Sequence, residues 1–148
     1  MATIVLTNAY VVFEDTFDYS ALVSNITLAT THDVLDVTPV KEGTIYKEVI
    51  AGVGTNSVQF DFYQDFANNS LEEFIGGEPG NISMPNRIGT KISCKVRPIN
   101  APISASNPEY RFEALITEWT PLNAAVGQIS TISVNWPISG EINKVILP

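Results

Sequence analysis

The chain has little of the chemistry on which most catalytic and metal sites depend. Among its 148 residues there is one cysteine, Cys94, and one histidine, His32. A single cysteine excludes an internal disulfide, and one residue of each kind disfavours both a transition-metal site and a histidine-dependent catalytic triad. Cys94 falls on the apolar face of a predicted strand, where we expect a buried, unreactive thiol, and we expect His32 at the surface or in a turn. The sequence therefore predicts a non-enzymatic protein with no catalytic residues, no metal and no cofactor.

Positive charge and long apolar runs are also scarce. Eight lysines and arginines stand against sixteen aspartates and glutamates, which gives a net charge of −8. Such a balance argues against a protein that holds DNA or RNA by its phosphates, because that function needs clustered cations. No apolar run approaches the ~20 residues that span a bilayer, and no basic start followed by an apolar run marks a secretory signal. We therefore expect no membrane partner.

Threonine, asparagine and serine are abundant, with 13, 12 and 11 copies, and they favour strands and turns. Short apolar runs alternate with turn residues, which predicts one mainly-β domain spanning residues 1–148. Four segments place apolar side chains at every second position: 57–66, 91–97, 110–119 and 129–136. Each of them presents one apolar face that must be covered by a second layer, so we expect a β-sandwich or a flattened barrel.

One helix signal stands out against this background. Ser70 and Glu73 form a capping box, in which each side chain satisfies a backbone N–H at the start of a helix. The pattern predicts one short α-helix of about two turns, over about residues 70–76, that flanks the sheets.

The middle and the end of the chain are predicted from their turn residues. Residues 25–30 and 33–38 indicate two short strands. Residues 41–56 indicate a flexible hairpin arm, with a loose tip at Gly52–Asn56. A turn is expected at Ser139–Gly140, and both termini are expected to be flexible.

Carboxylates and tryptophans are the remaining candidates for ligand chemistry. A glycosidase needs two carboxyl groups held roughly 5–9.5 Å apart, and Asp61 and Glu113 would qualify if their strands were paired. No cluster of aromatic residues for stacking on sugars accompanies them. Trp136 shares its strand face with other apolar residues, which favours a place in the core, whereas Trp119 falls on the face opposite to Phe112.

Several short motifs follow one another along most of the chain. The most specific of them combines Val96–Ala101 with Ser104–Tyr110. The others are, in chain order, Leu6–Val11, Asn25–Leu28, Asp33–Thr38, Ile50–Val53, Ser57–Phe66 and Ser133–Pro137. In their order and spacing these motifs resemble the major tail tube proteins of long, non-contractile-tailed bacteriophages.

This resemblance implies a fold, a use and a set of partners. Members of that family are β-sandwiches or barrels with one flanking helix, and they form hexameric rings that stack into a tube through which DNA leaves. For this chain the resemblance implies a structural virion protein of the tail, made in the host cytoplasm, that self-assembles. Tape-measure and tail-terminator or tail-tip proteins are the further partners implied, and DNA would pass through without specific binding. The immunoglobulin-like domain that some relatives carry is not expected here.

Two sets of residues are candidate sites on this interpretation. An arm that stacks one ring on the next would include Lys41, Glu42, Gly43, Thr44, Gly52 and Gly54. A lumen wall would include side chains on the face opposite to the predicted core, namely Asp61, Glu113, Thr131 and Ser133. The same parity rule places Lys91, Lys95 and Arg97 on that face, where we expect them to pair with acidic neighbours or to lie at subunit seams.

Three other interpretations remain open at the level of sequence. The arm could be an ordinary mobile loop. The chain could be a tube or connector protein of a related phage-tail-like particle. It could also be a carbohydrate-binding β-sandwich module, which would stay monomeric and bind glycans.

Overall fold

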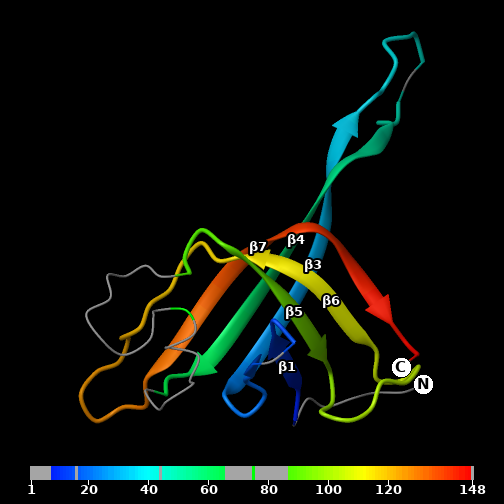
Figure 1. Ribbon diagram of the computed structural model, residues 1–148. Helices are drawn as coiled ribbons and strands as arrows, with labels where there is room; N and C mark the ends of the chain where they lie inside the picture. Colours follow the sequence, from blue (N-terminus) through cyan, green and yellow to red (C-terminus); the bar gives the residue numbers. More distant parts are fainter. Residues whose placement is uncertain (1–7, 16, 44, 66–74, 76–86, 148) are drawn as a thin grey trace.

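The computed structural model describes residues 8–15, 17–43, 45–65, 75 and 87–147. This part of the chain forms one antiparallel sheet of seven strands in the order β2-β1-β5-β6-β7-β4-β3 (Figure 1). The strands are β1 (Tyr10–Phe13), β2 (Phe17–Asp18), β3 (Val23–Asp36), β4 (Val49–Tyr63), β5 (Lys91–Arg97), β6 (Glu109–Leu115) and β7 (Thr131–Val145).

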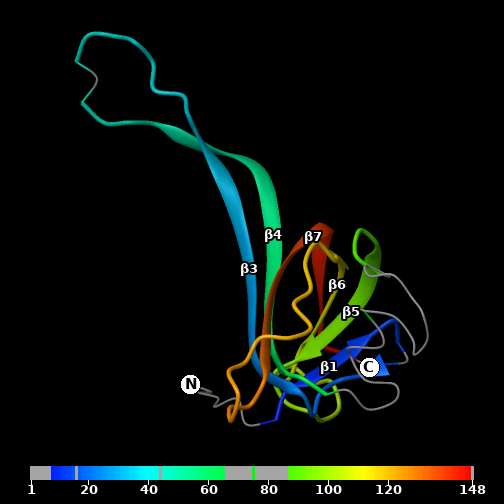
Figure 2. The ribbon, with the colours of Figure 1, turned by 90° about the vertical axis from the view of Figure 1, so that its left-hand side faces the viewer.

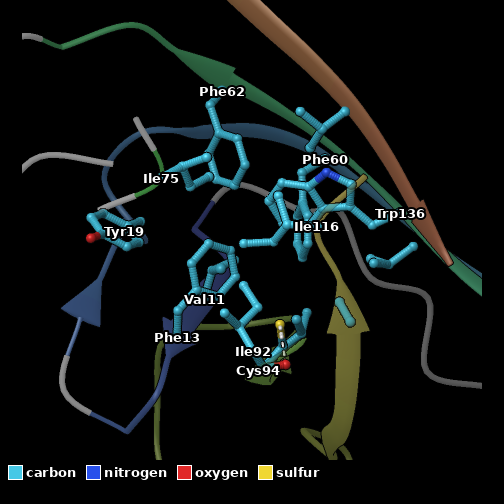
Figure 3. Packing of buried hydrophobic residues seen from close by; sticks show 14 of the residues in the cluster. Val11, Phe13, Tyr19, Phe60, Phe62, Ile75, Ile92, Cys94, Ile116 and Trp136 are labelled. Atoms are coloured by element: carbon cyan, nitrogen blue, oxygen red, sulfur yellow. Dashed lines mark hydrogen bonds between the residues drawn. The ribbon is translucent and has the colours of Figure 1, made fainter. Parts of the chain in front are cut away.

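The sheet curls so that its two halves cover each other. Three strands separate β1 from β4, and yet the ring of Phe13 on β1 lies 5.7 Å from Phe60 and 6.3 Å from Phe62 on β4, centroid to centroid. The ring centroid of Trp136 on β7 also lies 6.2 Å from that of Phe13 (Figure 3). These contacts cross the inside of the curl, and they confirm the predicted mainly-β, flattened-barrel class.

The alternation predicted from the sequence determines which side chains face the inside. The buried residues of the four alternating segments are Val58, Phe60, Phe62, Ile92, Cys94, Val96, Phe112, Ala114, Ile116, Ile132, Val134 and Trp136. Tyr110, which was expected with them, is only half-buried. Trp119 is 7% exposed, and it belongs to the core even though its parity differs from that of Phe112. The core position of Trp136 is confirmed.

Three local predictions are wrong in their boundaries. β3 is one strand of 14 residues with a register shift between His32 and Val34, and not two short strands. Gly52–Asn56 lies within β4, so the turn of the hairpin is residues 37–48. β7 runs through Ser139 and Gly140, where positive φ and a register shift opposite β6 make a bulge instead of a turn.

The predicted helix over residues 70–76 lies outside the described residues, except for Ile75. This residue has helical backbone geometry, and its fully buried side chain belongs to the core cluster. Within the described part of the chain, no helix is long and apolar enough to cross a membrane.

Candidate assembly surfaces

The outer part of the β3–β4 hairpin projects far beyond the body of the molecule (Figures 1 and 2). β4 pairs with β7 only from Asn56 to Tyr63. Beyond that point, among the described residues, β3 and β4 pair only with each other, as far as Asp36 and Val49. We call residues 32–54 the arm. A two-stranded ribbon without a covering layer is marginally stable alone in water, so the arm is a strong candidate for a contact with another chain.

The arm exposes many apolar side chains. Its large hydrophobic residues with at least about two-fifths of their surface exposed are Val34, Leu35, Val37, Val40, Ile45, Tyr46, Val49, Ile50 and Val53. Exposed apolar residues gathered on one projecting element are typical of interaction surfaces, whereas scattered single ones are ordinary. The outer edge of β3 adds a row of backbone groups without a strand partner in the described chain, which is a further template for association.

Hydrogen bonds hold the end of the arm where the strands turn. Thr38 accepts a hydrogen bond from the amide of Glu48 at 2.7 Å, and Val37 donates to the Glu48 carbonyl at 2.9 Å. The pKa of Asp36 lies below its ordinary value of 3.8 because the Thr38 hydroxyl and the Thr38 amide donate to the carboxylate. Asp36 also lies 3.8 Å from the ammonium of Lys47. These contacts order the base of the turn, although its apolar residues remain exposed.

The glycines expected in the arm occur there, but inside a strand. Gly54 is directly opposite His32 on β3, and a Cβ on this glycine would lie 2.8 Å from the ring carbon Cε1. The ring Nδ1 lies 3.2 Å from the carbonyl oxygen of Gly52. The exposed imidazole therefore covers the two glycines at the point where the register shifts. His32 has a structural place on the surface, as expected. Of the other predicted arm residues, Lys41, Glu42 and Gly43 lie in the turn, and Thr44 lies outside the described residues.

The residues predicted to line a lumen all lie on the outer face of the sheet, but not in one group. The carboxylate of Asp61 accepts a hydrogen bond from the hydroxyl of Ser133 at 2.5 Å and another from the side-chain amide of Asn25 at 3.1 Å. Thr131 is the first residue of β7, two residues before Ser133. Glu113 is opposite Ser139, six residues from Ser133 along β7, which is about 20 Å at ~3.3 Å per residue. Because β7 separates β4 from β6, Asp61 and Glu113 are not the close pair that a glycosidase requires.

The outer face is also divided by charge. On β4 and β7 the outer pairs Gln59–Asn135 and Asp61–Ser133 are polar or acidic. Four of the eight cations of the chain lie on β5 and β6: Lys91, Lys95, Arg97 and Arg111. Two of the three cations that the sequence placed on the outer face have acidic partners. Lys95 pairs with Asp15, and the guanidinium of Arg97 lies 3.3 Å from the carboxylate of Glu109. Lys91 has no ion-pair partner among the described residues.

Glu109 and Asn107 organise the β5–β6 connection, and neither is among the candidate residues predicted from the sequence. The carboxylate of Glu109, 1% exposed, accepts hydrogen bonds from Arg97 and Arg111. The side chain of Asn107 accepts from the amide of Ile99 and donates to three carbonyls, those of Ile99, Ala101 and Pro102. Both belong to the stretch that carried the most specific part of the resemblance. The signal available was an Asn-Pro-Glu sequence between two strands, but no local pattern shows that these side chains are buried.

Cys94 and His32, the cysteine and the histidine of the chain, lie on different strands, β5 and β3. Cys94 is fully buried, and burial raises the pKa of its thiol, which keeps it protonated and unreactive. In the described ranges no three histidine, cysteine, aspartate or glutamate side chains are placed to hold a metal ion together.

Comparison with known proteins shows similarity in fold. No protein-family model and no curated protein matches the chain. The solved structure of the virion of a native gene transfer agent particle contains a similar chain, with a TM-score of 0.64 and 13% identity over 97% of this chain and 99% of that one. The tail of an empty gene transfer agent particle with C6 symmetry contains another, with a TM-score of 0.55 and 11% identity over 92% of each chain. At these identities the likeness establishes the fold that this chain shares with components of such particles.

Proposed function

We propose that this chain is a structural subunit of a phage-tail-like particle that self-assembles into stacked six-membered rings. The observation that carries the proposal is the arm, an exposed two-stranded ribbon that projects from the body and pairs with no other strand of the described chain. The fold supports it, because the matching chains belong to a virion and to a tail of C6 symmetry and align over nearly their whole length.

The bare edges of the sheet favour association into rings. An open sheet with bare edges associates unless the edges are paired or covered. Contacts of one kind around a ring close on themselves, whereas contacts of one kind along an axis continue as a filament. The outer edge of β3 can serve the first kind of contact and the arm the second. The resulting tube would be a conduit for DNA ejection, with tape-measure and terminator or tip proteins at its ends.

The lumen is assigned to the outer face of β4 and β7. This part of the face carries Gln59, Asp61, Ser133 and Asn135 in paired positions, and these side chains are polar or acidic. Six copies at −8 each would give a ring a charge of −48. A wall without cations does not retain phosphates, so DNA would slide past it. Lys91, Lys95 and Arg111 on the outer face of β5 and β6 would then lie toward subunit seams, with Glu113 at the border between them and the lumen.

Removal of the arm tests the proposal. Thr31 and Thr55 are Cα partners, so a two-residue Asn-Gly turn can join them in place of residues 32–54 and leave the remaining ladder with β7 intact. We expect the wild-type protein to form rings and tubes at high concentration under the electron microscope, and the short-arm variant to form a folded body without tubes. Its melting temperature should stay close to that of the wild type, because the arm covers none of the core.

A matched control separates the arm from apolar exposure in general. Val126 is fully exposed in the β6–β7 connection, so Val126→Ser removes an exposed apolar side chain elsewhere on the surface, and tubes should still form. Tubes of normal length from the short-arm variant would contradict a stacking role. A wild-type protein that stays monomeric at all concentrations and binds a glycan array would instead favour a carbohydrate-binding module.

A further inference from the structure

A groove of about 790 Å³ runs between β3 and the ends of β5, β6 and β7 that carry Val96, Tyr110 and Lys144. Its apolar walls come from the inner faces of both halves of the curled sheet, and they include Ile26, Leu28, Val96 and Ile142. Ile26, Leu28 and Ile142 are partly buried against the core cluster. The groove is therefore an opening into the curl, and it is too apolar to be a favourable surface in water.

One side of the groove is positively charged. Arg97 and Lys144 both line it. Arg97 and Arg111 both pair with the single carboxylate of Glu109, so this cluster of three side chains has a net positive charge. Lys144 is exposed and has no ion-pair partner among the described residues. An occupant of the groove should accordingly combine apolar side chains with carboxylates.

The arm has this combination. Its exposed apolar residues are interspersed with the carboxylates of Asp33, Asp36, Glu42 and Glu48, against two lysines, so the arm has a net negative charge. The arm cannot enter the groove of its own chain. Thr30 of β3 lines the groove, whereas the turn follows the end of β3 at Asp36. Asp36 is six residues further along the strand, about 20 Å away at ~3.3 Å per residue, on a ribbon that points away from the body (Figure 2).

We infer that the groove receives the arm of a second copy of this chain. The contact is heterologous, because the arm of each copy leaves its own groove free for the next copy, and repetition builds a filament. The inference deepens the proposed function by naming the surface that the stacking arm contacts, and it rests on that proposal only in taking a second copy as the partner. Apolar side chains of the arm fill the groove, and its carboxylates lie beside Lys144 and Arg97.

A mixing experiment tests this arrangement. Lys144→Glu places a negative charge in the groove, and Lys91→Glu makes the same change of charge on the outer face of β5 as a matched control. We expect Lys144→Glu to raise the concentration needed for tubes at least about tenfold, because like charges across an interface are strongly unfavourable. Lys91→Glu should change it much less. The Lys144→Glu protein retains an arm, and the short-arm variant retains a groove, so their mixture should form assemblies of two layers that neither forms alone. Equal effects of the two charge changes, or a mixture that stays as unassociated as its components, would overturn the inference.

A covalent readout separates this inference from the proposed function. Cys94 is buried, so cysteines introduced at Lys144 and at Val40 or Ile45 are the only accessible thiols among the described residues. With a short bismaleimide, the double-cysteine proteins should give a ladder of linked chains, and each single-cysteine protein should give none. Linked chains without rings or tubes would support the groove contact and contradict the tail function. Tubes without linked chains at either arm position would support the tail function and contradict the groove contact.

Discussion

At the scale of single residues, buried polar side chains hold the connections of this protein in place. Asn107 is 4% exposed, and its amide nitrogen donates to three backbone carbonyls. Buried polar groups contribute little net stability when they are satisfied, but they are costly when they lose their partners. The ordered form of the β5–β6 connection therefore depends on the donor atoms of one side chain.

We predict that Asn107→Asp lowers the free energy of unfolding by roughly 3 kcal/mol at neutral pH. The two side chains have nearly the same shape, but the carboxylate turns an acceptor toward three carbonyl oxygens, each of which loses one hydrogen bond and faces a negative charge. Urea unfolding measures the change. Asn100→Asp is the control, since it makes the same change of charge at an exposed position and should cost much less. Equal losses from the two variants would contradict this role of Asn107.

A second residue-scale prediction concerns acid and the base of the arm's turn. The pKa of Asp36 is lowered by hydrogen bonds from Thr38, so the ionised form favours the ordered turn. This contribution is present above the ordinary value of 3.8, and it is lost as the pH falls through the lowered pKa. An NMR titration of the Asp36 carboxyl should therefore give a higher pKa in Thr38→Val, nearer to 3.8. Thr31→Val, which changes a hydroxyl further down β3, should leave the value of the wild type.

At the scale of elements, the hairpin depends on a close fit between its two strands. The edge of the His32 ring occupies the space where a side chain at position 54 would begin. Glycine usually weakens a strand, but here it allows the imidazole to lie across the ribbon where the register shifts. The glycines that suggested a loose tip in the sequence thus belong to an ordered segment.

We predict that Gly54→Val weakens the arm, although valine favours strands. The new Cβ would lie 2.8 Å from the His32 ring, so the ring must leave its position and lose its contact with the Gly52 carbonyl. Amide hydrogen exchange in the outer β3–β4 ladder should show a loss of protection of about 1 kcal/mol, the order of the strain of a displaced rotamer. The double variant His32→Ala with Gly54→Val should recover most of it. A single variant as protected as the wild type would show that the ring is not fixed there.

At the scale of the whole molecule, the distribution of charge bears on the proposed conduit. The chain is acidic, and yet half of its cations lie on the outer face of β5 and β6. Glu113 lies among them, opposite Ser93 on β5 and Ser139 on β7. It therefore marks the border between the cationic strands and the polar strands that we assign to the lumen.

We predict that Glu113→Lys slows the exit of DNA from assembled particles and makes the rate more dependent on salt. Each new cation in the lumen would hold a phosphate, and such contacts weaken as salt rises. Glu113→Gln is the control, because it removes the negative charge without adding a contact. Rates equal to those of the wild type across a salt series would place Glu113 outside the lumen. Asp61→Lys is a less selective test, because it also breaks the hydrogen bonds to Ser133 and Asn25.

The sequence by itself determined the class of fold and most of the core. Alternation at positions 58–62, 92–96, 112–116 and 132–136 specifies which side chains face the inside, because the period of a strand is two and its register cannot slip without exposing that face. The same rule places Asp61, Glu113, Thr131 and Ser133 outside, and one buried cysteine follows from its place in the same pattern.

Only the tertiary structure decided which strands are neighbours and how far the hairpin extends. Strand order depends on contacts between residues far apart in the chain, so no local pattern could show that β7 separates Asp61 from Glu113. The arm continues past its glycines because His32 covers Gly54, and Glu109 is buried because Arg97 and Arg111 both reach it. Each of these features depends on a contact with another segment of the chain. Such a contact contributes to the free energy of folding only when the two segments have been brought together.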